Sequence, residues 1–234
     1  MGKSWKNPMK AAQAAKKGQL FTKFAKEIAV AAKLGGPDPD SNARLKLAVN
    51  VARAASCPKD TIERAIKKGS GQLDDGTIIE ELTYEGHAPH NVGVIIECQT
   101  DNKNRTISDL RTIFNKKGGR MGESGSVQWM FDRVSIIEGS HDNISDPEEE
   151  AIEAGANDVE DNGDSTFAFY GEVSDLDTIR TALTERGWDI TKAELGYRPK
   201  NFSEINEEQK QEVIDFLEAL EDNDDTHRVY ATIS

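Results

Sequence analysis

The lysines and arginines of the first third of the chain are the residues whose number and spacing most clearly indicate chemistry. Residues 1–72 contain 15 Lys and Arg against 5 Asp and Glu, a net charge of +10, whereas the whole chain of 234 residues carries −13. Residues 134–234 contain 7 basic against 27 acidic side chains. Exposed charges are screened beyond about 8 Å at physiological salt, so a basic face attracts a polyanion even on an acidic protein. Lysines on a mixed surface would only keep it soluble, but a separation this complete favours an anionic partner for the N-terminal part.

The phosphates of nucleic acid are the anions that such a surface fits. At about 100° per residue, Lys16, Lys23, Lys26 and Lys33 fall opposite the apolar stripe of a helix predicted at about 19–34. These lysines would contact phosphates, and Trp5 would stack on a base. The predicted nucleic-acid-binding set comprises Lys3, Trp5, Lys6, Lys10, Lys16, Lys17, Lys23, Lys26, Lys33, Arg44, Lys46, Arg53, Arg64, Lys67 and Lys68.

A second basic cluster flanks a helix predicted at about 107–117. Lys116 and Lys117 at its C-terminal end favourably meet the helix dipole, which is a sufficient structural explanation. Asn, Arg and Lys side chains at the other end suit phosphate contact, so the structural role and ligand binding both stay open. This second candidate patch comprises Asn102, Lys103, Asn104, Arg105, Arg111, Lys116, Lys117 and Arg120.

Motifs for catalysis or metal binding are incomplete. The segment 122–126 resembles a nucleophile elbow but ends in Ser126 where the motif requires glycine. The segment that starts at Asp158 begins like a calcium loop, but its twelfth position is Phe169, which cannot chelate. His87 and His90 lack a third ligand and are interpreted as turn residues. We therefore expect a protein that is not an enzyme, with no metal, no cofactor and no small-molecule substrate.

The other polar or reactive segments have structural interpretations. Cys57 and Cys98 offer neither a disulfide framework nor metal-ligand spacing. The acidic run 222–225 is interpreted as a solvated turn. The N-terminus lacks the apolar region of a secretory signal, and no segment approaches the roughly 20 apolar residues of a membrane-spanning helix. These features indicate a cytoplasmic protein.

Helical periodicity dominates the basic part. Helices are expected at about 9–17, 19–34 and 42–56, with a fourth that Pro58 opens, and Gly18 is expected to separate the first two. Together they form a basic helical bundle over 1–72, with a flexible linker after it.

The period of the apolar residues then changes to that of strands. Strands are expected at 81–84, 92–99 and 127–131, and Thr106 with Asp109 would form the capping box of the 107–117 helix. Residues 134–198 follow the βαββαβ order of a ferredoxin-like unit. A helix at about 207–221 and a strand at 228–233 need a partner and are assigned to the earlier sheet.

The elements together predict a multidomain α+β fold. An N-terminal helical bundle is followed by two α+β domains, one of which is ferredoxin-like and inserted in the other. The predicted boundaries are 1–72 for the bundle, 77–133 plus 199–234 for the middle domain, and 134–198 for the inserted domain.

Several long motifs resemble the YebC/PmpR family. They are Asp101-Asn-Lys-Asn-Arg-Thr106, Lys117-Gly-Gly119, Gly122-x-x-Gly125-Ser-Val127-x-x-x-Phe131 and Tyr84-Glu-Gly86. N-terminal runs that include Phe21-Thr-Lys23, Gly35-Gly36-Pro-Asp38-Pro39, Ala43-Arg-Leu45 and Pro58-Lys-Asp60 are similar to the same family. The chain departs from the family pattern at Gly2-Lys3-Ser4-Trp5-Lys6 and at His87-Ala-Pro-His90-Asn91, which puts target preference in doubt.

The resemblance implies three domains and a role in gene expression. Family members are described as probable transcriptional regulators that bind DNA, and others act as translational activators associated with the ribosome. We therefore expect a nucleic-acid-binding transcriptional regulatory protein, with a ribosome- or RNA-associated translation factor as the alternative. The sequence shows no recognition helix, RNP motif or zinc finger that would separate DNA from RNA.

Overall fold

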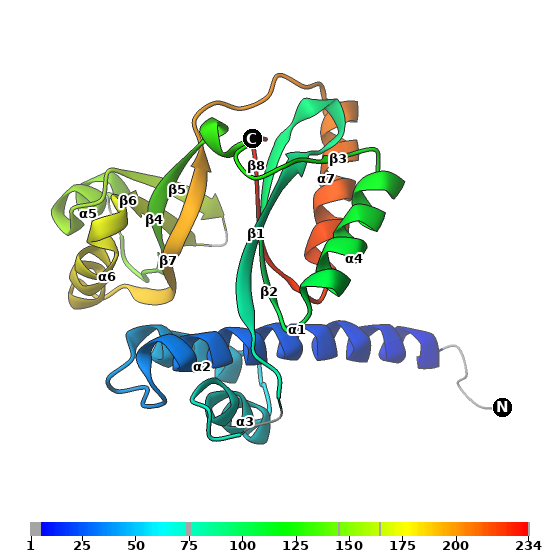
Figure 1. The fold of residues 1–234 in the computed structure, drawn as a ribbon. Helices are drawn as coiled ribbons and strands as arrows, with labels where there is room; N and C mark the ends of the chain where they lie inside the picture. Colours follow the sequence, from blue (N-terminus) through cyan, green and yellow to red (C-terminus); the bar gives the residue numbers. More distant parts are fainter. Residues whose placement is uncertain (1–5, 74–75, 145, 164, 234) are drawn as a thin grey trace. The chain divides into compact units, whose positions relative to one another are not determined.

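The computed structural model describes residues 6–73, 76–144, 146–163 and 165–233, and for 6–15 it describes the backbone alone. The chain folds into two compact units (Figure 1), one of Met1–Glu123 with Ile205–Val229 and one of Ser124–Glu204 with Tyr230–Ser234. The boundaries predicted above for three domains remain a prediction. No helix within the described ranges is long and apolar enough to cross a membrane.

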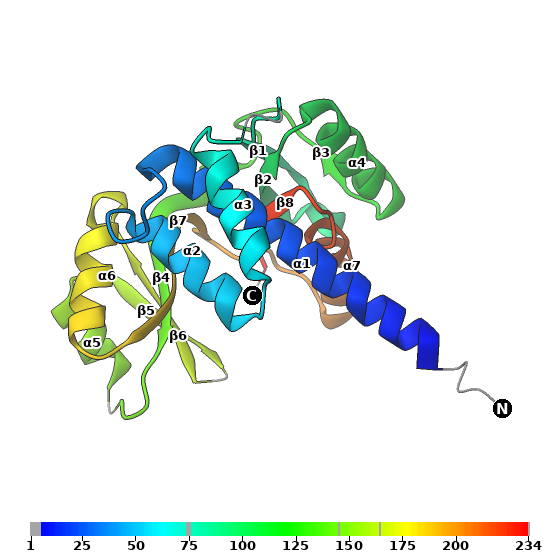
Figure 2. The same ribbon diagram turned by 90° about the horizontal axis from the view of Figure 1, so that it is seen from below.

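Three helices form the N-terminal bundle, in which α1 (Lys6–Gly35) packs against α2 (Ala43–Ala54) and α3 (Lys59–Gly69) (Figure 2). The predicted break at Gly18 is wrong, since α1 runs straight through it. A single glycine costs a helix only about 1 kcal/mol, which a helix of this length tolerates. The bundle core contains Ile28, Leu45, Val49, Ala52 and Ile62, which are all buried.

Asn42 fixes the corner between α1 and α2. Its side-chain oxygen accepts a hydrogen bond from the backbone N–H of Leu45 at 3.0 Å, which caps α2. Its amide nitrogen donates to the carbonyl oxygens of Ala31 at 2.8 Å and Gly36 at 2.9 Å. One side chain therefore satisfies the end of α1 and the start of α2.

The first unit also holds a four-stranded sheet in the order β3-β1-β2-β8. Its strands are β1 (Glu80–His87), β2 (Gly93–Thr100), β3 (Arg120–Met121) and β8 (Thr226–Ala231). The C-terminal strand thus returns to the earlier sheet, as its need for a partner predicted. The short strand β3 was not predicted.

Helices α4 (Lys103–Lys116) and α7 (Glu207–Glu221) pack against each other through Phe114 and Phe216. The two rings are arranged edge to face, with their centroids 5.0 Å apart. The predicted capping box of Thr106 and Asp109 is wrong: α4 begins four residues earlier, and Asn102 caps it by accepting from Arg105 N at 3.1 Å. Asn102 and Thr106 are both residue types that cap helices. The hydroxyl of Thr106 is instead buried and donates to the carbonyl oxygen of Asn102 and to Asp225.

The second unit is a sheet of order β5-β6-β4-β7 with two helices. Its elements are β4 (Phe131–Ser140), α5 (Pro147–Ala154), β5 (Asp158–Gly163), β6 (Thr166–Gly171), α6 (Leu176–Glu185) and β7 (Asp189–Pro199). The βαββαβ order of the ferredoxin-like prediction is confirmed. The strand predicted at 127–131 is wrong, because a 3-10 turn (Gln128–Met130) precedes β4 there.

Candidate nucleic-acid interface

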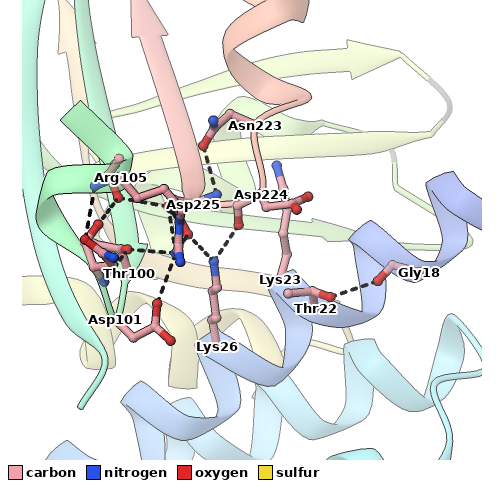
Figure 3. Close-up of polar contacts among 12 residues, drawn as sticks. Gly18, Thr22, Lys23, Lys26, Thr100, Asp101, Arg105, Asn223, Asp224 and Asp225 are labelled. Atoms are coloured by element: carbon pink, nitrogen blue, oxygen red, sulfur yellow. Dashed lines mark hydrogen bonds and ion pairs between the residues drawn. The ribbon is translucent and has the colours of Figure 1, made fainter. Parts of the chain in front are cut away.

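The lysines predicted to form a free basic face on α1 do not share one environment. Lys23 and Lys26 point toward the turn that follows α7 (Figure 3). The Nζ of Lys23 donates to the carbonyl oxygen of Glu221 at 2.5 Å, and that of Lys26 donates to the carbonyl oxygen of Asp224 at 2.7 Å. We call residues 221–225 the acidic turn. Its contacts with α1 remove two central lysines from the free surface.

Asp225 holds the centre of this contact. Its Oδ1 lies 2.6 Å from the Nζ of Lys26 and 2.9 Å from an Nη of Arg105, and its Oδ2 accepts from the hydroxyl of Thr106 at 2.8 Å. Burial alone would raise the pKa of Asp225, but hydrogen bonds from Arg105, Lys26 and Thr106 lower the pKa to about 2. The interpretation of 222–225 as a solvated turn is therefore wrong for Asp225, whose side chain is only 2% exposed.

Glu27 organises a second group of contacts on α1. Arg44 donates to both of its carboxylate oxygens, at 2.8 and 3.0 Å, and to Glu81 at 2.9 Å, while Gln99 donates to Glu27 at 2.7 Å. Burial would raise the pKa of Glu27, but the hydrogen bonds and charge of Arg44 bring the pKa below its ordinary value. Burial lowers the pKa of His227, whose Nε2 lies 3.3 Å from Glu27. Arg44 thus serves an internal cluster and is half-buried there.

Other predicted cations remain at the surface. Lys33 is exposed but donates to the carbonyl oxygen of Ile79 at 3.2 Å, and Lys46 lies 3.5 Å from Asp40. Lys17 lies 5.5 Å from the ring centre of Phe21, and Lys68 is half-buried with a partner. The exposed basic side chains that form neither an ion pair nor a hydrogen bond among the described residues of the bundle are Lys16, Lys17, Arg53, Arg64 and Lys67.

The side chains of four predicted nucleic-acid-binding residues at the start of the chain are not described by the structure. Lys3 and Trp5 fall outside the described residues, and Lys6 and Lys10 belong to α1 at positions where only the backbone is described. They stay predictions.

The second candidate patch divides into two ends with different roles. At the N-terminal end of α4, Asn102 is the cap, Lys103 lies 2.6 Å from Glu80, and Arg105 binds Asp101 and Asp225. These contacts are structural, although Asn104 beside them is exposed. At the C-terminal end, the exposed members are Arg111, Lys116, Lys117 and Arg120. Basic groups here also offset the negative end of the helix dipole.

The two histidines have different surroundings. His90 Nε2 lies 2.8 Å from a carboxylate oxygen of Glu212 on α7, and burial together with Arg120 lowers the pKa of His87. His90 also has a φ of 62°, as expected for the turn position that the sequence indicated.

Sequence reasoning missed the acidic partners of the basic face. Glu27 is the one carboxylate among the lysines of α1 between 16 and 33, and that isolation was a usable signal for a buried pair. Asp225 gave no comparable signal, because its partners Lys26 and Arg105 are 199 and 120 positions away.

These features define a mixed α+β protein with an N-terminal helical bundle and two four-stranded antiparallel sheets, whose bundle carries several exposed cations. Family models for the TACO1/YebC N-terminal domain and for the TACO1/YebC second and third domain match residues 3–72 and 79–233. The chain belongs to the TACO1/YebC family, so the resemblance found in the sequence is confirmed.

Relatives cover the full length of the chain. A probable transcriptional regulatory protein of Bdellovibrio bacteriovorus is 61% identical over 234 residues, and one of Pseudomonas fluorescens is 47% identical over 236, each alignment covering 100% of both chains. The crystal structure of a conserved hypothetical protein from Aquifex aeolicus is similar, with a TM-score of 0.85 and 42% identity over 94% of this chain and 91% of that one. The names of the relatives point to a regulatory protein.

Proposed function

We propose that this protein is a non-enzymatic regulator of gene expression that binds nucleic acid in the cytoplasm through its N-terminal bundle. The observation that carries the proposal is the set of exposed cations Lys16, Lys17, Arg53, Arg64 and Lys67 within a segment of net charge +10. Lysine and arginine side chains of this kind neutralise phosphates and release counterions, which gives affinity without sequence selection. The exposed end of α4 adds a second basic surface.

The geometry of α3 supports a phosphate-binding role for part of this set. Arg64 and Lys67 are three positions apart on one helix and so lie on the same face. Both are exposed, whereas Ile62 and Ala65 of the same helix are buried in the bundle core. The helix therefore presents its basic side to solvent and keeps its apolar side inside.

DNA is the target that the names of the relatives favour, since they are called transcriptional regulatory proteins. A ribosomal RNA target would belong to the translation-factor alternative. Phosphate contacts serve both polymers, so a direct comparison of a DNA duplex with a structured RNA of the same length separates them.

The test is binding of the full chain to labelled duplex DNA of mixed sequence and to a ribosomal RNA fragment, followed by fluorescence anisotropy. The triple variant Arg53→Gln, Arg64→Gln and Lys67→Gln should bind roughly tenfold or more weakly, with a salt slope shallower by about two to three. The control is Lys59→Gln on α3, the helix that carries Arg64 and Lys67, because Lys59 is already paired with Glu63 at 3.4 Å. Equal affinity of the folded triple variant and the control would contradict the proposal.

A further inference from the structure

The acidic turn contacts α1 through oxygen acceptors surrounded by negative charge, as a phosphate backbone would. Four of its five residues are acidic: Glu221, Asp222, Asp224 and Asp225. The carbonyl oxygen of Glu221 accepts from Lys23. The carbonyl oxygen of Asp224 and the carboxylate of Asp225 accept from Lys26 (Figure 3). Oxygen acceptors with surrounding negative charge are also what a nucleic-acid strand presents to lysine.

The negative charge of the acidic turn destabilises its position at the end of α7 unless cations lie nearby. It follows the C-terminus of α7, the negative end of the helix dipole, where acidic side chains are unfavourable. Glu221 ends the helix and Asp222 caps it. Lys23 and Lys26 offset this unfavourable placement, so the acidic turn and α1 stabilise each other.

The sheet side of the contact does not depend on α1. Asp225 keeps Arg105 and Thr106 as partners when Lys26 moves away, and its carbonyl oxygen accepts from Gln99 N at 2.9 Å. Asn223 accepts from Asp225 N at 2.9 Å within the turn itself. The acidic turn is therefore held in shape by α4 and β2, and release of the two lysines leaves it intact.

Displacement of the acidic turn would, in contrast, leave the lysines of α1 as one continuous basic surface. Lys16 and Lys23 lie close to two helical turns apart, as do Lys26 and Lys33, and Lys26 lies about one turn from Lys23. Lys16 is exposed now, whereas Lys26 is only 14% exposed because the acidic turn covers it. Removing the acidic turn would extend the exposed cations of α1 from Lys16 toward Lys26.

We propose that the acidic turn is an internal competitor of nucleic-acid phosphate for Lys23 and Lys26, so that the present structure is a closed form. This inference rests on the proposed function, since it regulates the same basic surface. Binding of a polyanion to these lysines and contact with the acidic turn exclude each other, and the two equilibria are linked reciprocally. A partner that displaces the turn gains two phosphate contacts beyond those of the exposed residues.

The test combines Asp225→Asn and Lys26→Gln, singly and together, with duplex DNA of mixed sequence as the probe. Asp225→Asn should tighten binding about three- to tenfold, and its salt slope should steepen by about one to two. Lys26→Gln should weaken binding by a larger factor in the Asp225→Asn background than in the unsubstituted chain. The matched control is Asp224→Asn, which removes the same charge from an exposed side chain but keeps the carbonyl oxygen that Lys26 uses.

The outcomes separate the two proposals. If the unsubstituted chain binds DNA and Lys26→Gln acts equally in both backgrounds, the competitor role is overturned and the proposed function stands. If no variant binds DNA or RNA, both fall. Should Asp225→Asn fail to fold, NMR of the unsubstituted chain decides: added duplex should shift the backbone amides of 221–225 together with the side-chain signals of Lys23 and Lys26. A response confined to lysines outside this contact would overturn the inference.

Discussion

Asp225 is a buried charged side chain whose replacement should weaken the first unit. The substitution Asp225→Asn keeps the size of the side chain but removes the charge that Lys26 and Arg105 share, and it weakens the acceptor for Thr106. A pKa lowered to about 2 from an ordinary value near 4 corresponds to roughly 2 to 3 kcal/mol of folding free energy. Arg105 is 46% exposed and also pairs with Asp101, so solvent and that second partner reduce the loss. We expect Asp225→Asn to cost about 2 kcal/mol.

The pH dependence follows from the direction of the shift. A carboxyl group with a lowered folded-state pKa contributes stability that is complete above its unfolded pKa near 4 and is lost as pH falls through about 2. Urea unfolding at neutral pH should therefore show a lower midpoint for Asp225→Asn than for the wild type. The difference between the two should shrink steadily from pH 5 toward pH 2.

The control for this experiment is Asp224→Asn, whose side chain is exposed in the same turn and which should stay within about 0.5 kcal/mol of the wild type. Equal losses for the two variants would refute the reasoning, because they would show that net charge and not the buried contact matters. A difference that persists unchanged at pH 2 would also refute it, because the carboxyl would then be acting in its neutral form.

Three further substitutions test the packing. Gly18→Ala should stabilise the chain by about 0.5 to 1 kcal/mol in thermal unfolding, since the added methyl group meets no atom within 4 Å and alanine favours a helix interior; a loss would show that α1 is interrupted there. Gly69→Ala should destabilise by about 1 to 3 kcal/mol, because its Cβ would lie 2.1 Å from the carbonyl oxygen of Ala29 and force α3 away from α1; an unchanged melting temperature would contradict this close approach. Phe216→Ala should cost about 3 to 5 kcal/mol in urea unfolding, because Phe216 is fully buried against Phe114; a loss below about 1 kcal/mol would mean that α7 does not pack on α4 as described.

Local sequence signals predicted most of the fold. Helices α5 and α7 begin and end where proline, capping residues and apolar spacing placed them. The βαββαβ order followed from strand runs together with the capping residues and apolar spacing of its two helices. The errors came where two local signals competed. Asn102 and Thr106 could each begin α4, and Gly18 could have ended a helix that the rest of the segment favours.

The basic surface was harder to predict, because exposure depends on what the distant parts of the chain cover. Helical periodicity correctly set Lys23 and Lys26 apart from the bundle core, but it carried no information on the acidic turn, almost 200 residues later, that covers them. Val30, an apolar residue on the face of the lysines, was a hint in the sequence that this side of α1 faces other protein atoms, and Val30 is indeed buried. Charge composition thus identified the basic N-terminal segment, whereas tertiary contacts determine which of its cations are exposed.

The salt dependence of nucleic-acid binding tests the central claim most directly. Affinity of the full chain for duplex DNA should fall linearly with salt on a double-logarithmic plot, with a slope of about −4 to −5 for four to six phosphate contacts. A slope near zero would mean that the exposed cations of the N-terminal bundle do not meet phosphates, and it would contradict the account.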